Sequence, residues 1–256
     1  MGEHAVSVAM AVEAMSLLGE GVAAGEIEER EPLAVEGPLA LADILSLTFI
    51  DRLFHDEHAH KEGHSHSSPA NNLHSDSHAA QTVHSHLEGG KPKDQLRTSR
   101  PKAHREHDPK SSSWIPPSAV YVLEKMAHGY KRLGREHGAG FYDYPANEPK
   151  RLWSGLKVFE RGGKAIPGED VRDRLLYAAA IEGLRRLDDP ATLRAEAVAL
   201  AEVLGPGFPA CDPVAFVQSV GLREFAERAQ QLAARYGDRF VVPTGALERV
   251  AGGRSS

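Results

Sequence analysis

The chain has 256 residues, a net charge of −6 at pH 7 and 41% hydrophobic residues, and this length allows one large domain or two small ones. The acidic balance argues against a general nucleic-acid-binding protein, because neutralising phosphates requires a basic excess or a basic face. The single cysteine, Cys211, excludes an intrachain disulfide framework and a zinc site made of cysteines alone. No apolar run approaches the roughly 18 residues that span a bilayer. The N-terminus lacks the features of a signal peptide. We therefore expect a cytoplasmic protein with no membrane span.

Apolar residues recur at helical spacing through most of the chain. This periodicity predicts helices over residues 5–18, 24–30 and 39–54 and, later, over about 117–130, 169–187, 192–204, 212–220, 222–236 and 246–250. Strand patterns are almost absent. The sequence therefore predicts an all-α fold.

Histidines gather in one segment of the chain. Eleven of the fourteen lie between His55 and His107, in a stretch with few apolar residues and no useful period. Such a segment buries too little apolar surface to offset the entropy of ordering, so residues 55–113 are predicted to form a disordered insert. Its closely spaced imidazoles could bind labile zinc or nickel, with His58, His60, His64 and His66 as candidate ligands. A histidine-rich linker that binds no metal is the alternative.

Three glycines, Gly134, Gly138 and Gly140, invite a test for nucleotide binding. A dinucleotide loop follows a strand and opens a helix, whereas these glycines follow a helix and run into an aromatic stretch. They are better explained by a tight loop at the end of a helix. The neighbouring basic residues could meet an anionic ligand or could form a solvated face: Lys131, Arg132, Arg135, Lys150 and Arg151.

Nucleophilic catalysis finds little support in the sequence. Cys211 is an unpaired cysteine in a helix-entry turn, and such residues are mostly packed and inert. Outside the histidine-rich segment, His4, His128 and His137 are the remaining general-base candidates. We interpret His128 and His137 as surface or capping residues.

Several strings, taken in order, resemble the C-terminal helical part of the 3-hydroxyacyl-CoA dehydrogenases, in the form found in the alpha subunits of multifunctional fatty-acid oxidation enzymes. The strings are Leu18-Gly-Glu-Gly-Val22, Glu36-Gly-Pro-Leu-Ala-Leu-Ala-Asp43, Leu133-Gly-Arg-Glu-His-Gly-Ala-Gly-Phe-Tyr-Asp-Tyr-Pro145, Arg151-Leu-Trp-Ser-Gly-Leu156, Arg174-Leu-Leu-Tyr177, Gly207-Phe-Pro209 and Leu232-Ala-Ala-Arg-Tyr-Gly237. The resemblance covers nearly all of the chain outside the insert.

The resemblance implies a duplicated helical domain. A faint internal echo agrees with this, since Ala11-Val-Glu-Ala-Met15 is similar to Ala180-Ile-Glu-Gly-Leu184. We expect a first repeat formed by residues 1–54 and 114–146, and a second formed by residues 147–256. In the family this part packs against an NAD-binding Rossmann domain, closes over the acyl-CoA and often forms a dimer.

The resemblance also implies which residues are missing. The family's catalytic histidine and its partner glutamate lie in or at the end of the nucleotide-binding domain, and we expect this sequence to start after them. An element that lies near the substrate in the family falls at His4 and Ala5, where its residues are not kept. Further departures are Glu36, Glu136 and the Cys211-Asp-Pro213 stretch. No catalytic or cofactor-binding residue is therefore carried over.

Two hypotheses follow for the function. In the first, the chain is a helical subunit or split half of a dehydrogenase and is inactive alone. It works with acyl-CoA and a separate Rossmann or hydratase subunit, and it forms a homo-oligomer. In the second, it is a non-enzymatic helical binding or metal-handling protein derived from that domain. Charges at Glu3, His4 and Glu36 mildly favour the second, since they would be costly if buried against a missing domain.

Overall fold

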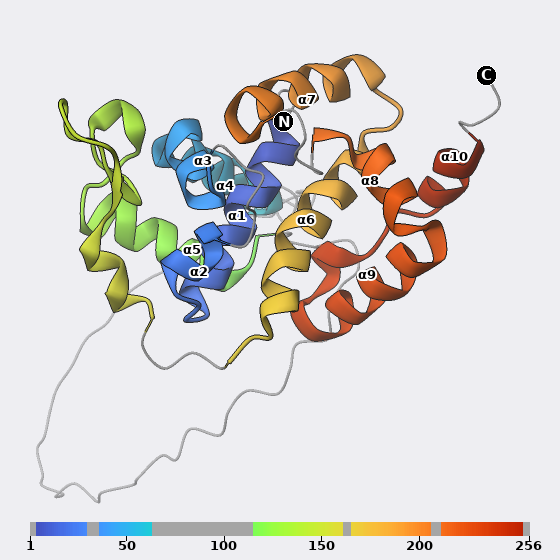
Figure 1. The fold of residues 1–256 in the computed structure, drawn as a ribbon, viewed down its shortest axis with the longest axis horizontal. Helices are drawn as coiled ribbons and strands as arrows, with labels where there is room; N and C mark the ends of the chain where they lie inside the picture. The colour runs from blue at the N-terminus through green and yellow to red at the C-terminus, as the bar shows by residue number, and fades with distance from the viewer. Residues whose placement is uncertain (1–3, 30–35, 63–114, 161–164, 206–210, 253–256) are drawn as a thin grey trace, which may run out of the picture.

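The computed structural model describes residues 4–29, 36–62, 115–160, 165–205 and 211–252, and of residues 56–62 it describes the backbone alone. The described residues are mostly helical, which confirms the all-α prediction (Figure 1). The α-helices are α1 (Ala5–Gly19), α2 (Ala24–Glu29), α3 (Pro38–Leu45), α4 (Leu47–Glu62), α5 (Pro117–Glu124), α6 (Gly168–Arg185), α7 (Pro190–Leu204), α8 (Pro213–Val220), α9 (Leu222–Tyr236) and α10 (Ala246–Gly252).

The centre of the molecule is formed by α1 and α6, which pack side by side (Figure 1). Fourteen of the fifteen residues of α1 are buried, since α3, α5 and α6 all pack against it. A helix that is hydrophobic all round is expected at the core of a fold rather than on its surface. In α6, twelve of eighteen residues are buried. These two helices therefore define the core around which the other elements lie.

The predicted helix over residues 39–54 is wrong in its continuity and in its end. Ser46 has a φ of 70° and separates α3 from α4. There the Leu47 N–H donates to the Leu133 carbonyl at 3.0 Å. A contact from a distant segment thus takes the place of the helical hydrogen bond. Helix α4 then continues to Glu62, eight residues into the predicted insert. The rest of that insert lies outside the described residues.

A short hairpin and several tight helical turns follow α5. The turns are the π-helical η1 (Lys125–Gly129) and the 3-10 helices η2 (Arg135–His137), η3 (Ser154–Val158) and η5 (Asp238–Phe240). Strands β1 (Tyr142–Asp143) and β2 (Arg151–Leu152) pair antiparallel, with Tyr142 opposite Leu152. They join residues on both sides of the repeat boundary that we predicted at residue 146, and the division into repeats stays a prediction.

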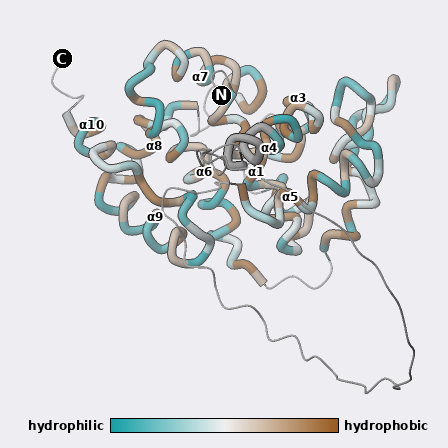
Figure 2. The backbone as a smooth tube through the Cα atoms, turned by 180° about the vertical axis from the view of Figure 1, so that it is seen from behind, coloured by the Kyte–Doolittle hydropathy of each residue, from teal (hydrophilic) through white to brown (hydrophobic). Residues whose placement is uncertain are grey.

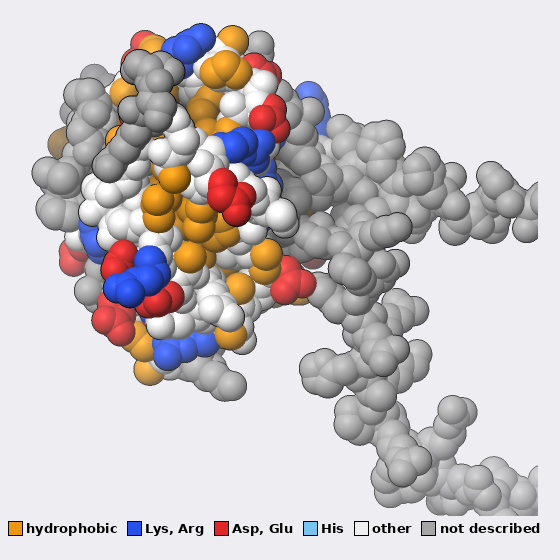
Figure 3. Space-filling model, turned by 90° about the vertical axis from the view of Figure 1, so that its right-hand side faces the viewer, with side chains coloured by type: hydrophobic (Ala, Val, Ile, Leu, Met, Phe, Trp, Pro, Cys, Tyr) orange, Lys and Arg blue, Asp and Glu red, His pale blue; other side chains and the backbone are white. Residues whose placement is uncertain are grey.

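The second part of the chain packs through an aromatic cluster. Tyr177 on α6 stacks on Phe225 of α9 with centroids 4.5 Å apart, and Phe216 of α8 meets both rings edge-on. In Figure 2, hydrophobic and hydrophilic stretches alternate along α7 and α9, as expected for helices with one face in solvent. Figure 3 shows the side of the molecule nearest α10, where hydrophobic side chains gather in the middle among scattered charges. Within the described ranges, no helix is long and apolar enough to cross a membrane.

Candidate functional site

A cleft of about 680 Å³ opens between the start of α1, the α3–α4 pair, the loop around η2 and helix α7. Its apolar lining comes from α3–α4 and α7, through Leu41, Ile44, Leu45, Phe49, Ala199 and Val203. Its charged or titratable lining residues are His4, Arg52, Glu136, His137 and Glu202. A concave apolar surface with a few polar groups at its edge is the usual form of a small-molecule site.

Two of the three histidines outside the histidine-rich segment line this cleft. His4 precedes α1, and its ring meets Phe49 edge-on with centroids 6.2 Å apart. His137 lies in η2. His128 lies elsewhere, with its Nε2 3.1 Å from Asp51 Oδ2. All three are exposed, in keeping with the surface interpretation of His128 and His137.

The N-terminus of α1 is closed by a carboxylate from α7. Glu196, which is 1% exposed, accepts hydrogen bonds from Ala5 N–H at 2.6 Å and Val6 N–H at 3.2 Å. The first N–H groups of a helix have no partner within the helix, and the helix dipole favours negative charge there. Glu196 therefore satisfies two donors at the edge of the cleft and links α7 to the core.

Buried Asp43, near the end of α3, holds the glycine-rich loop. Its carboxylate accepts from Phe141 N–H at 2.8 Å, Tyr142 N–H at 2.9 Å and Tyr144 Oη at 3.0 Å. Burial raises the pKa of Asp43 to about 6, although these three hydrogen bonds act to lower it. The loop thus takes its shape from a carboxylate that the sequence analysis did not single out as a site residue.

The sequence predicted that these glycines form a tight loop, and in the structure two of them, Gly134 and Gly140, also let the loop approach α3 closely. Gly134 has a φ of 119° and Gly138 one of 72°, conformations that suit glycine. A Cβ at Gly140 would overlap the Asp43 carboxylate, and one at Gly134 would meet the Asp43 carbonyl oxygen at 2.6 Å. The glycines let the loop backbone lie against α3.

The other end of α3 is held by a second, partly buried carboxylate. Glu28 of α2 accepts from Leu39 N–H at 2.7 Å and from Tyr142 Oη at 2.5 Å. Burial raises the pKa of Glu28, and the hydrogen bond from Tyr142 opposes this. Tyr142 thus connects the carboxylates at the two ends of α3. The string ending at Asp43 and the Gly-Phe-Tyr-Asp-Tyr-Pro string are therefore structural partners.

Three of the five basic residues near this loop form hydrogen bonds or ion pairs within the chain, and Arg135 lies 5.9 Å from the Tyr144 ring centroid. Arg132 donates to Gly140 O at 2.6 Å and to Asp143 Oδ1 at 2.6 Å, and its guanidinium lies 4.5 Å from the Trp153 ring centroid. Arg151 also pairs with Asp143, and Lys150 forms an ion pair with Glu36. These contacts give the three residues structural roles, and they compensate the charge of Glu36.

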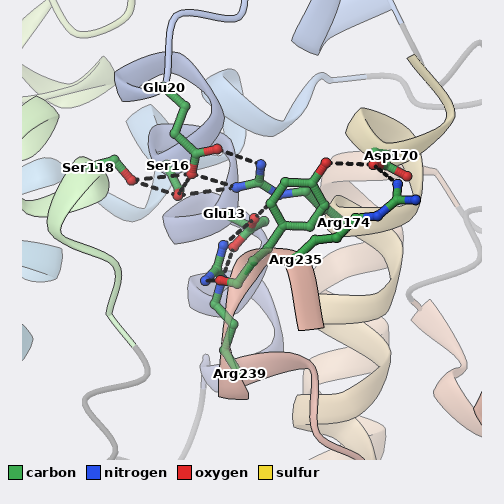
Figure 4. Close-up of polar contacts among 9 residues, drawn as sticks. Glu13, Ser16, Glu20, Ser118, Asp170, Arg174, Arg235 and Arg239 are labelled. Atoms are coloured by element: carbon green, nitrogen blue, oxygen red, sulfur yellow. Dashed lines mark hydrogen bonds and ion pairs between the residues drawn. The ribbon is translucent and has the colours of Figure 1, made fainter. Parts of the chain in front are cut away.

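A buried charge network joins α1 to α6 and to the end of α9 (Figure 4). The Arg174 side chain is fully buried and donates to Glu13 Oε1 at 2.6 Å, Glu20 Oε2 at 2.7 Å and Ser16 Oγ at 3.3 Å. Arg239 donates to Glu13 Oε2 at 2.6 Å, so that Glu13 lies between two guanidiniums. Burial acts to raise the pKa of Glu20, but hydrogen bonding and charge from Arg174 lower it on balance.

A second part of the network surrounds Asp170 at the start of α6. It accepts from Arg228 at 2.6 Å, Arg235 at 3.0 Å and Tyr236 Oη at 2.5 Å. Burial acts to raise the pKa of Asp170, and these three donors outweigh it and lower the pKa. Arg174 also lies 4.3 Å from the Tyr236 ring centroid, which joins the two parts. Every member is engaged by another, so the network stabilises the packing of α1, α6 and α9.

The predicted packing of Cys211 is confirmed. It is buried, its Sγ lies 3.6 Å from the Gly205 carbonyl oxygen, and burial raises the pKa of its thiol. Among the described residues, no group of three or more His, Cys, Asp or Glu side chains is arranged to hold a metal ion. The backbones of His58 and His60 belong to the last turns of α4, whereas His64 and His66 lie outside the described residues. Metal binding by these four stays a prediction.

Comparison with known proteins bears on the resemblance. A fatty acid oxidation complex subunit alpha from Vibrio vulnificus is 30% identical over 126 residues, and one from Vibrio parahaemolyticus is 29% identical over 129 residues. A peroxisomal fatty acid beta-oxidation multifunctional protein of Arabidopsis thaliana is 30% identical over 134 residues. Over about half of its length, the chain is homologous to these fatty acid oxidation proteins. No protein-family model matches it.

The extent of this homology is limited on both sides. The matches cover 47–48% of this chain, a smaller share than the quoted strings led us to expect, and about 18% of the length of each relative. The chain thus corresponds to a small part of proteins that are much longer. The expected family resemblance is confirmed at this level.

Sequence reasoning missed Glu196 and the cleft. A signal for Glu196 existed, because it lies four residues before Leu200 and three after Leu193, on the apolar face of α7. A charged residue on such a face needs a partner. The cleft itself left no local signal, since His4, His137 and Ala199 meet only in the folded chain.

Proposed function

We propose that this chain is the helical part of a protein of the 3-hydroxyacyl-CoA dehydrogenase type and supplies one wall of an acyl-CoA site. The observation that carries the proposal is the homology to fatty acid oxidation alpha subunits over half of the chain. In this account, hydride transfer to NAD and the catalytic histidine and glutamate belong to a separate nucleotide-binding region, so the chain alone does not oxidise substrate.

The position of the cleft supports this proposal. The resemblance places a substrate-facing element of the family at His4 and Ala5, and the cleft opens beside this point. Its apolar lining suits an acyl chain, which gains free energy by leaving water. Arg52, with His4 and His137 when protonated, would attract the phosphates of coenzyme A.

The charge at Glu36 no longer argues for the non-enzymatic alternative. That argument assumed a charge without compensation at a face meant for another domain. Because Lys150 pairs with Glu36 within the chain, such a face would not have to bury an isolated carboxylate.

The packing pattern supports a duplicated architecture as part of the proposal. In both halves, the second helix after a long buried helix is short and has proline in its first turn: α3, which begins at Pro38, comes after α1 and α2, and α8, which begins at Pro213, comes after α6 and α7. Each short helix packs against the long helix of its own half. We propose that a second copy of the chain and a Rossmann or hydratase subunit are its partners.

An acyl-CoA binding measurement on the full chain tests the proposal. We expect saturable binding of a long-chain 3-hydroxyacyl-CoA, at least tenfold weaker in Ala199→Trp, because the indole would fill the cleft from α7. The matched control is Ala195→Trp, an exposed position on the same helix outside the cleft lining, and we expect its affinity to stay within twofold of wild type. Equal binding by both variants, or NADH production by the chain alone, would contradict the proposal.

A further inference from the structure

Helix α7 differs from the core helices in how it is attached. Of its fifteen residues only Glu196, Leu200 and Leu204 are buried, whereas α6 buries twelve of eighteen. Val198 is 61% exposed, a high value for a valine in a helix. Figure 1 shows α7 lying across the end of α1, at the edge of the molecule. Leu193, Leu200, Ala201, Val203 and Leu204 pack against the core from one face of α7, so less apolar surface holds this helix in place than holds α6.

Both ends of α7 carry capping residues that belong to the adjoining chain rather than to the rest of the fold. Asp189 caps the N-terminus by accepting from Thr192 N–H at 3.1 Å and Thr192 Oγ1 at 2.7 Å. At the other end, Gly205 has a φ of 96° and donates its N–H to Ala201 O at 3.0 Å. A helix with its own capping residues can leave its neighbours as a helix. Without tertiary contacts, a helix of fifteen residues is only marginally stable in water, so it frays and its amides exchange while it is detached.

The polar link between α7 and the core is the Glu196 carboxylate. It accepts hydrogen bonds from the main-chain N–H groups of Ala5 at 2.6 Å and Val6 at 3.2 Å, in the first turn of α1. Further along α7, Ala199 one turn away and Glu202 and Val203 two turns away line the cleft. A movement that withdraws Glu196 from α1 would carry these three residues away from α3 and α4.

We infer that α7 is a lid on the cleft and that Glu196 is its latch. With the latch closed, α7 forms one wall of the cleft and covers the N-terminus of α1. With the latch open, α7 leaves as a helix, the cleft is enlarged, and water satisfies the donors of Ala5 and Val6. As a device that controls ligand access, this lid rests on the proposed function, but its movement does not require that function.

Native-state hydrogen exchange of the full chain, followed by residue, tests the lid without any ligand. Because the detached helix frays, we expect the amides of Leu200 and Leu204 to exchange at least a hundredfold faster than those of Leu175 and Leu176 in α6. Their exchange should depend only weakly on low urea concentrations, because a lid opening exposes little surface. Exchange of α7 at the same rate as α6, with the same urea dependence, would overturn the proposal.

The latch itself is tested by Glu196→Gln. Without the charge and with an amide facing one N–H donor, we expect exchange in α7 and at Ala5 and Val6 to rise at least tenfold, with α6 within twofold of wild type. The matched control is Arg194→Gln, which removes an exposed charge from the same helix outside the cleft lining, with an expected change below twofold. An unchanged α7 in Glu196→Gln, or an equal rise in α6, would overturn the latch. The proposed function is tested separately, because it fails if Ala199→Trp and Ala195→Trp bind acyl-CoA equally well.

Discussion

Two glutamates of this chain, Glu13 and Glu196, are each 1% exposed but have different roles. Glu13 lies in the middle of α1, between the guanidiniums of Arg174 and Arg239. Glu196 lies on α7 and is held by two main-chain N–H groups at the tip of α1. Removing either guanidinium leaves the buried Glu13 carboxylate with only one of its two cationic partners. Releasing Glu196 exposes groups that water can reach.

Burial alone therefore does not mark a residue of this chain as functional. The charges around Glu13 are all paired and join three helices, so they fix the core. The contact of Glu196 joins one weakly packed helix to that core, beside a cleft. Function in this chain is therefore expected at the edge of the molecule, where pairing is least redundant.

The largest expected effect is on the core network. Arg174→Met removes the cation shared by Glu13 and Glu20, and we expect the free energy of unfolding to fall by about 3–5 kcal/mol. The matched control is Arg185→Met on the same helix, where a partly exposed arginine pairs with Glu182 and the loss should stay below about 1 kcal/mol. Urea denaturation measures both, and a similar loss in the two variants would mean that the network is not the stabilising feature we describe.

Asp43 should make stability depend on pH. Its pKa is raised from 3.8 to about 6 in the folded chain, so its stabilising contribution is complete below pH 3.8 and is lost as the pH rises through 6. Asp43→Asn does not titrate at this position. The stability of wild type minus that of the variant should therefore fall by about 3 kcal/mol between pH 3.5 and 7.

Urea denaturation at a series of pH values measures this difference, and contributions of other groups cancel in it to first order. A stability difference that stays constant or rises with pH would contradict the claim that burial raises the pKa of Asp43.

A smaller effect is expected at the contact between loop and helix. In Gly140→Ala the new Cβ would overlap the Asp43 carboxylate, and overpacking of this kind costs about 1–3 kcal/mol. Gly25→Ala, in α2, is the control, because no atom lies within 4 Å of a Cβ built there. Its stability should be unchanged or up to about 1 kcal/mol higher, as expected for alanine in a helix. The temperature of thermal unfolding should therefore fall in Gly140→Ala and should stay the same or rise in Gly25→Ala.

The smallest expected effect on global stability belongs to the latch. Loss of a helix-capping carboxylate costs about 0.5–2 kcal/mol. In urea denaturation, the loss in the free energy of unfolding should therefore be clearly smaller for Glu196→Gln than for Arg174→Met. The difference between these two losses distinguishes a glutamate of the core from one at the edge of the molecule. A loss of stability in Glu196→Gln equal to that in Arg174→Met would place Glu196 in the core rather than at a movable edge.

The helices could be predicted from the sequence, because the spacing of apolar residues within each helix already shows which face it will bury. The break at Ser46 could not, since it depends on the Leu133 carbonyl more than eighty residues away. The string from Glu36 to Asp43 and the glycine loop were recognised as family strings. Their contact through Asp43, Tyr142 and Glu28 emerged only from the fold.

The candidate site was less accessible to sequence reasoning than the fold. His4 and His137 were considered singly as bases, and their common place on one cleft depends on the approach of α7 and the η2 loop. Arg174 was quoted within a string, but its two glutamates lie more than 150 residues earlier in the chain. Charged groups that meet across such separations have no pattern of their own in the sequence.

Photoaffinity labelling with a long-chain acyl-CoA that carries a photoreactive group on its acyl chain tests the central claim most directly. We predict that the label maps to α3–α4 and to α7, and that excess 3-hydroxyacyl-CoA prevents it. Labelling concentrated on α8–α10, or labelling that excess ligand does not reduce, would contradict the assignment of the cleft as the acyl site.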